Sequence, residues 1–600
     1  MKIAIAQMNT VAADFDVTVE RMLEYARQAK GQGAELVCYP FAALTGDEPM
    51  PEADQEGFLI DATNAVSALT DELPLPALVP VVASYGGEPM AEVMLIRDHR
   101  VTPVRLVSYL GGLAGGADDD STSDDADADP SPIAQLELGG CKVALAFDDD
   151  DLDELRAYDY DANVILYFNS YPFALNDPSS AMGCGLSNSR YGDDADQTGA
   201  WIVGVNGVGG YSDEVFVGSS FVLAPWGEMA AQAPALEEAL VVAAVDPADE
   251  GPLAHPLALE VYDPGLVGWG ALSLALRDLV AKSDHTDLAV LLEGTLQSAL
   301  VAALAVDSVG PVRVHMVLAK PQDQGLLEAM RSTAKALRVA DVREVDLSAG
   351  EDEATRADLA QVRLAALARE HDAIALGSTD KTSLALDDRT HGVYAASIEP
   401  LGDVYRSDVL WLARMRNTIS PVIAPELMKA YACPKVDGIR FCGPTDEVRL
   451  EFVDNVLESY IDFGRSVSDV SAHSGNSLIV MDLLRRVRDR ELSRAMGGGT
   501  PIVLSRMSIP DDPAPMVTPW RDHPRSSEEL SEVEQLESMG MGGDADVATA
   551  DGDEASREKV AHDIAAFLHD YLGGVYGNPG EDGGKKDDGQ QGGWMPFSEN

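Results

Sequence analysis

The sequence is poor in cysteine, in basic residues and in long apolar runs. Its 600 residues include 5 cysteines, which are spaced too widely to indicate a CxxC metal knuckle or a disulfide framework. The 43 basic side chains face 101 acidic ones, so the formal net charge is −58. A charge of this size repels nucleic acid and anionic membrane surfaces. No apolar run approaches the ~18 residues of a membrane span, and the first residues do not have the pattern of a signal peptide. We therefore expect a cytoplasmic protein with no nucleic-acid and no membrane partner.

Short apolar runs alternate with amphipathic helical patterns and predict two α/β domains. In residues 1–250, the strand-like runs are Lys2–Met8, Leu36–Tyr39, Val143–Phe147, Val164–Phe168 and Trp201–Val205. A second block, residues 288–524, starts with the apolar run Leu288–Leu292 and continues with helix and strand patterns. Alternation of this kind is typical of layered α/β domains. Residues 251–287, which contain three prolines, are the predicted connection.

Acidic residues gather at Asp118–Asp129, at Asp148–Glu154 and in the last part of the chain. A solvated acidic surface, as in a salt-adapted organism, accounts for this charge without a dedicated function. Residues 525–600 are rich in Gly, Asp and Ser, so we expect them to be mostly disordered. One amphipathic helix is predicted there. Its apolar face would consist of Val560, Ile564, Phe567, Leu568 and Tyr571.

Several motifs of the two domains are long and ungapped. They are Tyr39-Pro40, Ala43–Gly46, Asn169–Phe173, Val205–Gly210 and Asp213–Phe221 in the first, and Ser298–Gly310, Leu376–Thr382 and Glu399–Arg406 in the second. In content and order, the motifs resemble those of the glutamine-dependent NAD synthetases, and the resemblance extends over residues 1–520. It implies an N-terminal nitrilase-like α-β-β-α sandwich and a C-terminal doubly wound parallel α/β synthetase domain of the ATP-pyrophosphatase type. It also implies an ATP-dependent ligase that uses Mg²⁺, forms NAD from deamido-NAD and glutamine, and works as a large homo-oligomer.

A glutaminase of this family needs a cysteine nucleophile, a glutamate base and a lysine that supports the oxyanion. The resemblance places the glutamate at Phe41, the lysine at or near Val107 and the cysteine at Phe147. No lysine occurs in residues 31–141. Arg105 differs from lysine in size and geometry and does not readily take its role. We therefore predict that no intact catalytic residue remains in this domain.

The synthetase domain of the family begins with a Ser-Gly-Gly-x-Asp-Ser loop between a strand and a helix. Small residues there let backbone N–H groups reach a pyrophosphate, and the aspartate holds Mg²⁺. At this place the chain has Glu293, Gly294, Thr295, Leu296, Gln297 and Ser298. Glu293 puts negative charge where a polyphosphate would bind, and Gln297 lacks the charge of the metal ligand. A second metal-binding residue of the family, a glutamate, corresponds to Ser383. We predict a degenerate nucleotide loop without a metal site.

Some residues of the family's nucleotide site persist further along the chain. They are Lys381, Thr382 and Thr390, with Arg406 in place of a lysine. These residues predict a residual nucleotide site. The alternative is that Lys381 and Arg406 are solvated surface residues. The ten histidines show neither HxxxH spacing nor paired carboxylates, so we expect no structural metal and no bound cofactor.

We expect a catalytically silent paralogue of the NAD synthetases that acts as a structural or regulatory subunit. The hypothesis rests on strands that stay apolar while residues at the chemical centres differ from those of the family. Such a subunit would form a homo-oligomer, or a hetero-oligomer with an active NAD synthetase. Two alternatives stay open. One is an active NAD synthetase with reworked sites, and the other is a nucleotide sensor without turnover.

Overall fold

The computed structural model describes residues 1–41, 43–46, 56–85, 88–108, 133–158, 160–347, 352–387, 391–495, 497–510 and 524. The chain divides into two units, Met1–Pro524 and Arg525–Asn600. The predictions made for Asp118–Asp129, for Thr390 and for a helix in the second unit lie outside the described residues. In the parts of the chain that are described, no helix is long and apolar enough to cross a membrane.

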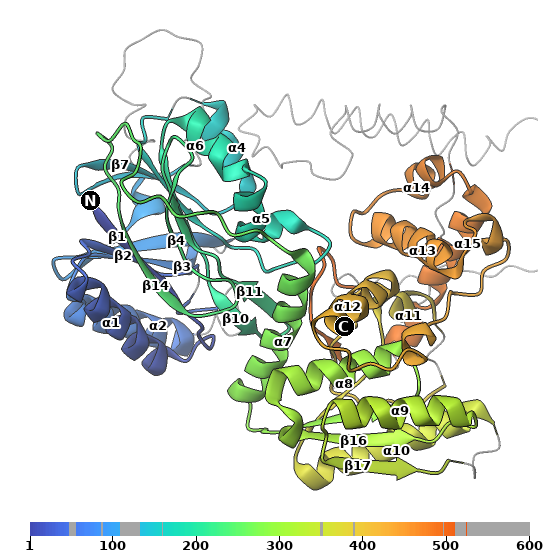
Figure 1. The fold of residues 1–600 in the computed structure, drawn as a ribbon. Coiled ribbons are helices and arrows are strands. Elements are labelled where there is room, and N and C mark those ends of the chain that lie inside the picture. The colour runs from blue at the N-terminus through green and yellow to red at the C-terminus, as the bar shows by residue number, and fades with distance from the viewer. Residues whose placement is uncertain are drawn as a thin grey trace, which may run out of the picture. The chain divides into compact units, whose positions relative to one another are not determined.

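The first domain contains a mixed sheet that is covered by helices on one face. Its strand order is β14 (Ala239–Ala244), β1 (Lys2–Gln7), β2 (Leu36–Cys38), β3 (Ala77–Tyr85), β4 (Glu88–Arg97) and β5 (Arg100–Pro103). β1 pairs with β14 in antiparallel and with β2 in parallel orientation. Helices α1 (Phe15–Gly31) and α2 (Glu56–Glu72) pack on the outer face of this sheet (Figure 1).

A second six-stranded sheet completes this domain. Its order is β13 (Met229–Gln232), β12 (Phe221–Leu223), β9 (Trp201–Val205), β8 (Val164–Phe168), β7 (Cys141–Ala146) and β6 (Gln135–Leu138). Helices α4 (Asp149–Ala157), α5 (Met182–Ser187) and α6 (Arg190–Thr198) supply its outer layer. The hairpin β10 (Val208–Tyr211) and β11 (Glu214–Val217) stands apart from both sheets.

Alternation along the strands divides the apolar side chains between two layers. Ile3 and Ile5 of β1 belong to the core between the two sheets, whereas Ala4 and Ala6 face α1 and α2. Because side chains in a strand point to alternate faces, one strand can serve both layers. The predicted α-β-β-α sandwich is confirmed.

The sheet of the second domain is entirely parallel. Its order is β17 (Asp341–Val345), β16 (Val314–Ala319), β15 (Leu288–Leu292), β18 (Ile374–Leu376), β19 (Ile398–Glu399) and β20 (Thr500–Pro501). Helices α8 (Leu296–Val309) and α9 (Gln324–Ala336) pack on one face, and α10 (Glu353–His371) packs on the other (Figure 1). Helices on both faces of a parallel sheet confirm the doubly wound fold.

Further helices follow the sheet strands of this domain. They are α11 (Lys381–Leu386), α12 (Arg406–Ile419), α13 (Asp446–Ile461), α14 (Val467–Ser474), α15 (Ser477–Asp489) and α16 (Glu491–Ala495). Helices α11, α13, α14 and α15 share an apolar core of their own. The helical region, drawn in orange tones in Figure 1, was not predicted from the sequence.

Most of the predicted connection forms one helix, α7 (Pro264–Lys282). Asp263 caps it by accepting a hydrogen bond from Leu266 N–H at 2.9 Å, and Pro264 begins it. The helix packs against β10 and β11 of the first domain and against α8 of the second. The segment between the two sheets is therefore a core element of the first unit.

Candidate functional site

Packed aromatic rings occupy the region where we placed the glutaminase residues. Phe147 directly follows β7 and is 4 % exposed. Its ring meets that of Phe41 edge-on, with the centroids 6.1 Å apart, and stacks on Phe168 at 6.0 Å. All three rings contact the core between the two sheets. The ring cluster of Phe41, Phe147 and Phe168 joins the two sheets by apolar contact.

Val107, the residue at the predicted lysine position, is not part of this ring cluster. Val107 lies in a helical turn at residues 104–108, and its side chain is 51 % exposed. The guanidinium carbon of Arg105 lies 4.8 Å from the centroid of the Phe147 ring. The backbone N–H groups of Arg105 and Leu106 donate to the buried Glu92 carboxylate at 2.8 and 3.0 Å. Arg105 therefore places its positive charge beside the ring cluster, while its backbone is held by Glu92.

Carboxylates hold the turn between β7 and α4. Asp148 caps α4 and accepts from Asp151 N–H at 2.7 Å, while Asp151 accepts from Phe147 N–H at 2.8 Å. Burial raises the pKa of Asp151 to about 6. Both carboxylates therefore accept hydrogen bonds from nearby backbone N–H groups.

The cysteines of this domain lack the surroundings that activate a thiol. Cys38 is fully buried at the end of β2, and burial raises its pKa. Burial also raises the pKa values of Cys141 and Cys184. A nucleophilic thiol needs the opposite change, because the thiolate is the reactive form.

The loop after β15 turns into α8 as the resemblance implies. Gly294 has a φ of +91°, and a Cβ there would lie 2.9 Å from Leu326, so the turn requires glycine. Thr295 caps α8. The partly buried Glu293 accepts from the Ser378 hydroxyl at 3.0 Å, and burial raises its pKa. The backbone therefore has the strand–loop–helix form of a phosphate loop, with a carboxylate at its start.

Three backbone amides at this loop already have acceptors within the protein. The N–H of Leu296 donates to the carbonyl of Ala430 at 3.0 Å, and the N–H of Ser298 donates to the Thr295 hydroxyl at 3.2 Å. The N–H of Glu293 donates to the Ser298 hydroxyl at 3.3 Å. An anion that approached these amides would have to displace their protein acceptors.

Arg406 and Asp380 form a buried ion pair at the start of α11. Arg406 donates from Nε and Nη2 to the two oxygens of Asp380 at 2.7 and 3.0 Å, and from Nη1 to the Ala432 carbonyl at 2.7 Å. Its Nη2 also contacts the Ser383 hydroxyl. The Gln297 amide donates to Asp380 at 2.7 Å. Burial opposes the charge of Asp380, but Arg406 outweighs it and lowers the pKa of this carboxyl.

Lys381 is completely buried among acceptors. Its ammonium lies 2.5 Å from Asp462 and 2.9 Å from Asp403, and it also donates to the Ser505 hydroxyl at 2.5 Å and the Met507 carbonyl at 2.7 Å. Two carboxylates compensate the desolvation of this cation. Asp403, Asp462 and the other acceptors were missed by sequence reasoning; only Asp403 lies in one of the quoted motifs.

The alternative that Lys381 and Arg406 are solvated is wrong, because they are 0 % and 7 % exposed. The neighbouring Thr382 is also buried, and its hydroxyl donates to Asp454 at 2.7 Å. Burial raises the pKa of Asp454 to about 6. Lys381, Thr382 and Arg406 are therefore part of a buried polar network.

A cavity of about 830 Å³ lies at the carboxyl edge of the sheet, beside the loop after β15. The predicted site residues that line it are Glu293, Thr295, Gln297, Ser383 and Arg406. Three basic residues, Lys435, Arg486 and Arg490, also line it and were missed by sequence reasoning. Lys381 and Thr382 are not among the described lining residues. Ligands of parallel α/β sheets bind at this edge, so the cavity is the candidate binding site of the second domain.

Two known family models match parts of this chain. The carbon-nitrogen hydrolase family model matches residues 2–99 and 194–255, and the NAD synthase family model matches residues 269–495. Together the two models match more than half of the chain.

Relatives of known name match across both domains. The glutamine-dependent NAD(+) synthetase of Rhodobacter capsulatus is 27% identical over 565 residues, with 87% of this chain and 99% of the relative covered. The synthetase of the same name from Acinetobacter baylyi is 26% identical over 564 residues, with the same coverage.

Solved structures show the same fold. The glutamine-dependent NAD+ synthetase of Acinetobacter baumannii, solved with ADP, aligns with a TM-score of 0.58 at 22% identity, with 87% of this chain and 99% of that chain covered. The synthetase from Cytophaga hutchinsonii aligns with a TM-score of 0.62 at 12% identity, with 89% and 99% covered.

Fold and comparisons define a protein in which a nitrilase-like carbon-nitrogen hydrolase domain is joined to an NAD synthase domain. This is the architecture of a ligase family. The chain belongs to the glutamine-dependent NAD(+) synthetase family.

Proposed function

We propose that this chain is a catalytically silent member of its family and acts as a structural or regulatory subunit. The observation that carries the proposal is the pairing of Arg406. Its three guanidinium nitrogens are used by Asp380, Ala432 and Ser383, so the cation that would meet a nucleotide phosphate is neutralised by the protein. The carboxylate of Glu293 adds negative charge to the wall of the same cavity.

The first domain supports the proposal in a different way. The resemblance in motifs assigns Phe41 and Phe147 to the places of the family's glutamate and cysteine, and no cysteine occurs in the turn after β7, where Asp148 caps α4. The two aromatic rings pack in the core between the sheets. We therefore expect neither a thioester step nor ammonia release in this domain.

Magnesium does not fit the residues at the family's metal positions. Gln297 uses its amide to donate to Asp380, and Ser383 contacts Arg406. Both oxygens of Asp380 accept from Arg406. A hard cation requires several free oxygens, whereas this place is filled by a guanidinium group. We expect no Mg²⁺ and no ATP-dependent step here.

The test is an NAD synthesis assay with the purified full-length chain, ATP, Mg²⁺ and deamido-NAD. It is run once with glutamine and once with ammonium, and glutamate release is measured in parallel. The Rhodobacter capsulatus relative serves as the positive control. We expect neither NAD nor glutamate above the no-protein background. NAD formation would instead support an active synthetase with reworked sites.

The subunit role predicts an assembly. The sandwich and the doubly wound domain retain their apolar layers, so surfaces that assemble in the family can persist without catalysis. We expect the chain to form a homo-oligomer or to associate with an active NAD synthetase of the same cell. Size-exclusion chromatography with light scattering tests this, alone and after mixing. A monomer that neither co-elutes with the synthetase nor changes its rate would contradict the subunit role.

A nucleotide sensor without turnover is the second candidate. It is favoured by the 830 Å³ cavity and by Lys435, Arg486 and Arg490 on its wall. Titration calorimetry with ATP and with deamido-NAD distinguishes the two roles. A sensor would bind one of them, and Lys435→Ala would weaken binding while Lys429→Ala, a lysine outside this lining, would not. Absence of heat with both ligands would contradict the sensor role.

A further inference from the structure

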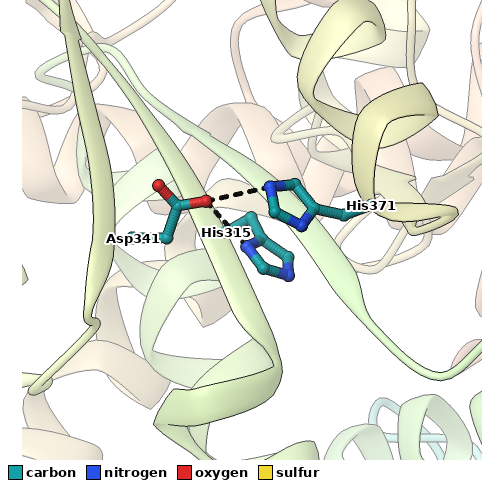
Figure 2. A group of neighbouring side chains, drawn as sticks. All are labelled: His315, Asp341 and His371. Atoms are coloured by element: carbon teal, nitrogen blue, oxygen red, sulfur yellow. Dashed lines mark hydrogen bonds and ion pairs between the residues drawn. The ribbon is translucent and has the colours of Figure 1, made fainter.

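A group of histidine and aspartate side chains lies at the amino edge of the parallel sheet. His315 is in β16, Asp341 begins β17, and His371 ends α10 shortly before β18 (Figure 2). The loop from Glu293 to Ser298 follows the carboxyl end of β15. Because these strands are parallel, the two places lie at opposite edges of the sheet.

The backbone determines this grouping. In the parallel ladder His315 and Asp341 are register partners, so their side chains leave neighbouring strands at the same level. His371 is the last residue of α10, and Asp372 ends the helix in the left-handed conformation with a φ of +51°. The chain then enters β18, which pairs with β15. Strand register and a helix end thus bring together residues that are distant in the sequence.

The donor atoms converge on one carboxylate oxygen. Asp341 Oδ2 lies 2.9 Å from His315 Nδ1 and 3.1 Å from His371 Nε2. One ligand atom from each of the three residues lies within 4.8 Å of the others. His315 is 7 % exposed as a residue, whereas the side chains of Asp341 and His371 are 31 % and 26 % exposed. The group is therefore open to solvent on one side and supported by the sheet on the other.

We propose that His315, Asp341 and His371 form a binding site for a divalent transition-metal ion, with Zn²⁺ as the best match. Two imidazole nitrogens and a carboxylate oxygen are ligands that Zn²⁺ accepts at about 2.0–2.2 Å. The fourth position would be taken by water, because the protein supplies three ligands.

A second carboxylate supports the ligand role of His315. Its other ring nitrogen, Nε2, lies 2.9 Å from Asp287 Oδ2. Ligating histidines commonly donate their second N–H to a carboxylate, which fixes the ring and makes the ligating nitrogen more basic. Asp287 precedes β15, so the supporting group also comes from the sheet. Asp287 is a positioning residue in this site.

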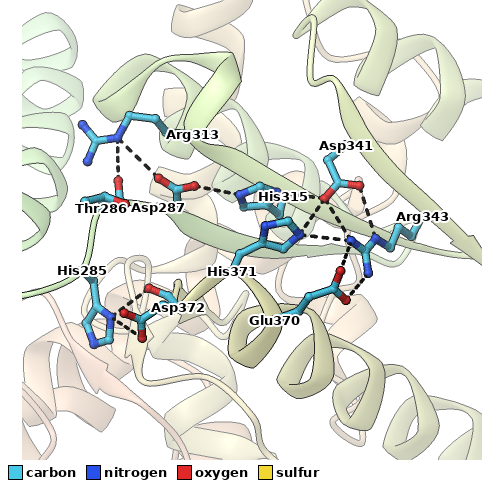
Figure 3. Close-up of polar contacts among 10 residues, drawn as sticks. All are labelled: His285, Thr286, Asp287, Arg313, His315, Asp341, Arg343, Glu370, His371 and Asp372. Carbon is cyan, nitrogen blue, oxygen red and sulfur yellow. Dashed lines mark hydrogen bonds and ion pairs between the residues drawn. The ribbon is translucent and has the colours of Figure 1, made fainter.

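Arg343 is the cation now next to the ligand atoms. Its Nη2 lies 3.0 Å from His371 Nε2 and 3.4 Å from Asp341 Oδ2, and Glu370 holds the guanidinium at 2.6 and 2.9 Å (Figure 3). The rings of His315 and His371 stack at 3.5 Å. When the ion binds, Nη2 withdraws toward Glu370, the His371 ring turns its Nε2 to the ion, and the protons on the ligating nitrogens pass to solvent.

The experiment uses the full-length chain, freed of any histidine tag, treated with a chelator and dialysed. Zn²⁺ is titrated by calorimetry, and the metal content after desalting is measured by mass spectrometry. We expect one equivalent of Zn²⁺ per chain for the wild type. His371→Ala and Asp341→Asn should lose this equivalent, and Asp287→Asn should weaken binding by about 10- to 100-fold.

The control variant is His285→Ala. His285 lies on the same edge and pairs with Asp372, but it is not a proposed ligand, so its loss should leave the equivalent in place. Arg343→Gln should tighten binding, because it removes the competing cation. Co²⁺ in place of Zn²⁺ should give visible absorption bands of nitrogen and oxygen coordination without a thiolate band.

Two results would overturn the site. One is a wild type that retains no more Zn²⁺ than His371→Ala, and the other is Arg343→Gln that binds no more tightly than the wild type. Thermal unfolding in chelator shows that each variant is folded before metal is added. A variant that fails this check is replaced by His371→Gln, whose side chain keeps the volume but not the ligand nitrogen. The readout is metal content, so it does not depend on NAD synthesis.

Discussion

Several buried charges of the second domain lie beside oppositely charged partners. Asp380 and Lys381 follow each other in the sequence, yet each has a separate partner set, Arg406 for the first and Asp403 with Asp462 for the second. Leaving such a group without its partner exposes the full desolvation cost of a buried charge. The pairs therefore make substitutions at these places costly even where no reaction occurs.

The Asp380–Arg406 pair gives the first prediction. Asp380→Asn should lower the free energy of unfolding by about 3–5 kcal/mol, because it leaves the Arg406 charge buried and uncompensated. The control is Glu447→Gln, which breaks a pair with the exposed Arg414 and should cost about 0.2–1 kcal/mol. Urea unfolding measures both values. Equal losses in the two variants would contradict the role assigned to the buried pair.

Asp408 gives a prediction about pH. Burial raises its pKa from 3.8 to about 7, with Asp454, Glu458 and Asp462 adding repulsion. A carboxyl with a raised pKa in the folded state stabilises the fold while protonated. This contribution is full below about pH 4 and is lost as the pH rises through about 7.

Asp408→Asn should therefore remove part of the loss of stability between about pH 4 and pH 8, on the order of 2–4 kcal/mol. The exposed Asp284→Asn is the control and should leave the pH profile unchanged. Chemical unfolding is measured at several pH values. A profile of Asp408→Asn that runs parallel to the wild type would refute the prediction.

At the scale of elements, α7 ties the first domain to the second. Asp278 of this helix accepts from the Gly210 N–H and from the Asn9 amide, both at 2.8 Å. Lys282 donates to the carbonyls of Thr10 and Gly210 at 2.7 and 2.6 Å. The hairpin β10–β11 thus attaches to the helix through its backbone, and this requires a close approach at Gly210.

A methyl group at Gly210 tests that approach. Its Cβ would lie 3.0 Å from the Cα of Ala275 in α7, so Gly210→Ala should destabilise the fold by about 1–3 kcal/mol. In the control Gly57→Ala the added methyl meets open space within α2, and helix propensity makes the change neutral or stabilising by up to about 1 kcal/mol. Equilibrium unfolding compares the two. If Gly210→Ala unfolds like the wild type, the tight contact is wrong.

Strands with continuous apolar runs could be predicted from the sequence. The bounds of β8, β9 and β15 agree with the runs that predicted them. β17 was missed because three of the five residues in Asp341–Val345 are charged, so the segment has no apolar run. Helices α13, α14 and α15 are not part of the strand–helix alternation, and they are stabilised by a core that they form with one another and with α11.

The position of the nucleotide loop could be predicted, but its pairing could not. Glu293 to Ser298 lie between β15 and α8 as the motif indicates. The acceptors of Lys381 come from three separate segments. Asp403 precedes α12, Asp462 follows α13 and Ser505 follows β20, so only folding brings them together. Likewise, His315, Asp341 and His371 show no metal spacing in the sequence, because strand register places Asp341 beside His315 and the end of α10 supplies His371.

At the scale of the whole molecule, the charge of −58 opposes compaction. Raising the KCl concentration from about 0.1 to 1 M shortens the screening length from about 10 to about 3 Å. We expect the thermal midpoint at pH 7 to rise over this range. The rise should be smaller near pH 5, closer to the pI of about 4.2. A midpoint that falls with KCl at pH 7 would contradict the role of acidic repulsion.

We expect that the second domain forms no NAD. Ammonium supplied directly bypasses the first domain, so the decisive quantity is NAD formed per chain from ammonium, ATP, Mg²⁺ and deamido-NAD during a long incubation at high protein concentration. We expect less than one NAD per chain, because Arg406 is bound by Asp380 and the Glu293 carboxylate lies at the start of the loop. Repeated turnover, with NAD in excess over protein, would contradict it.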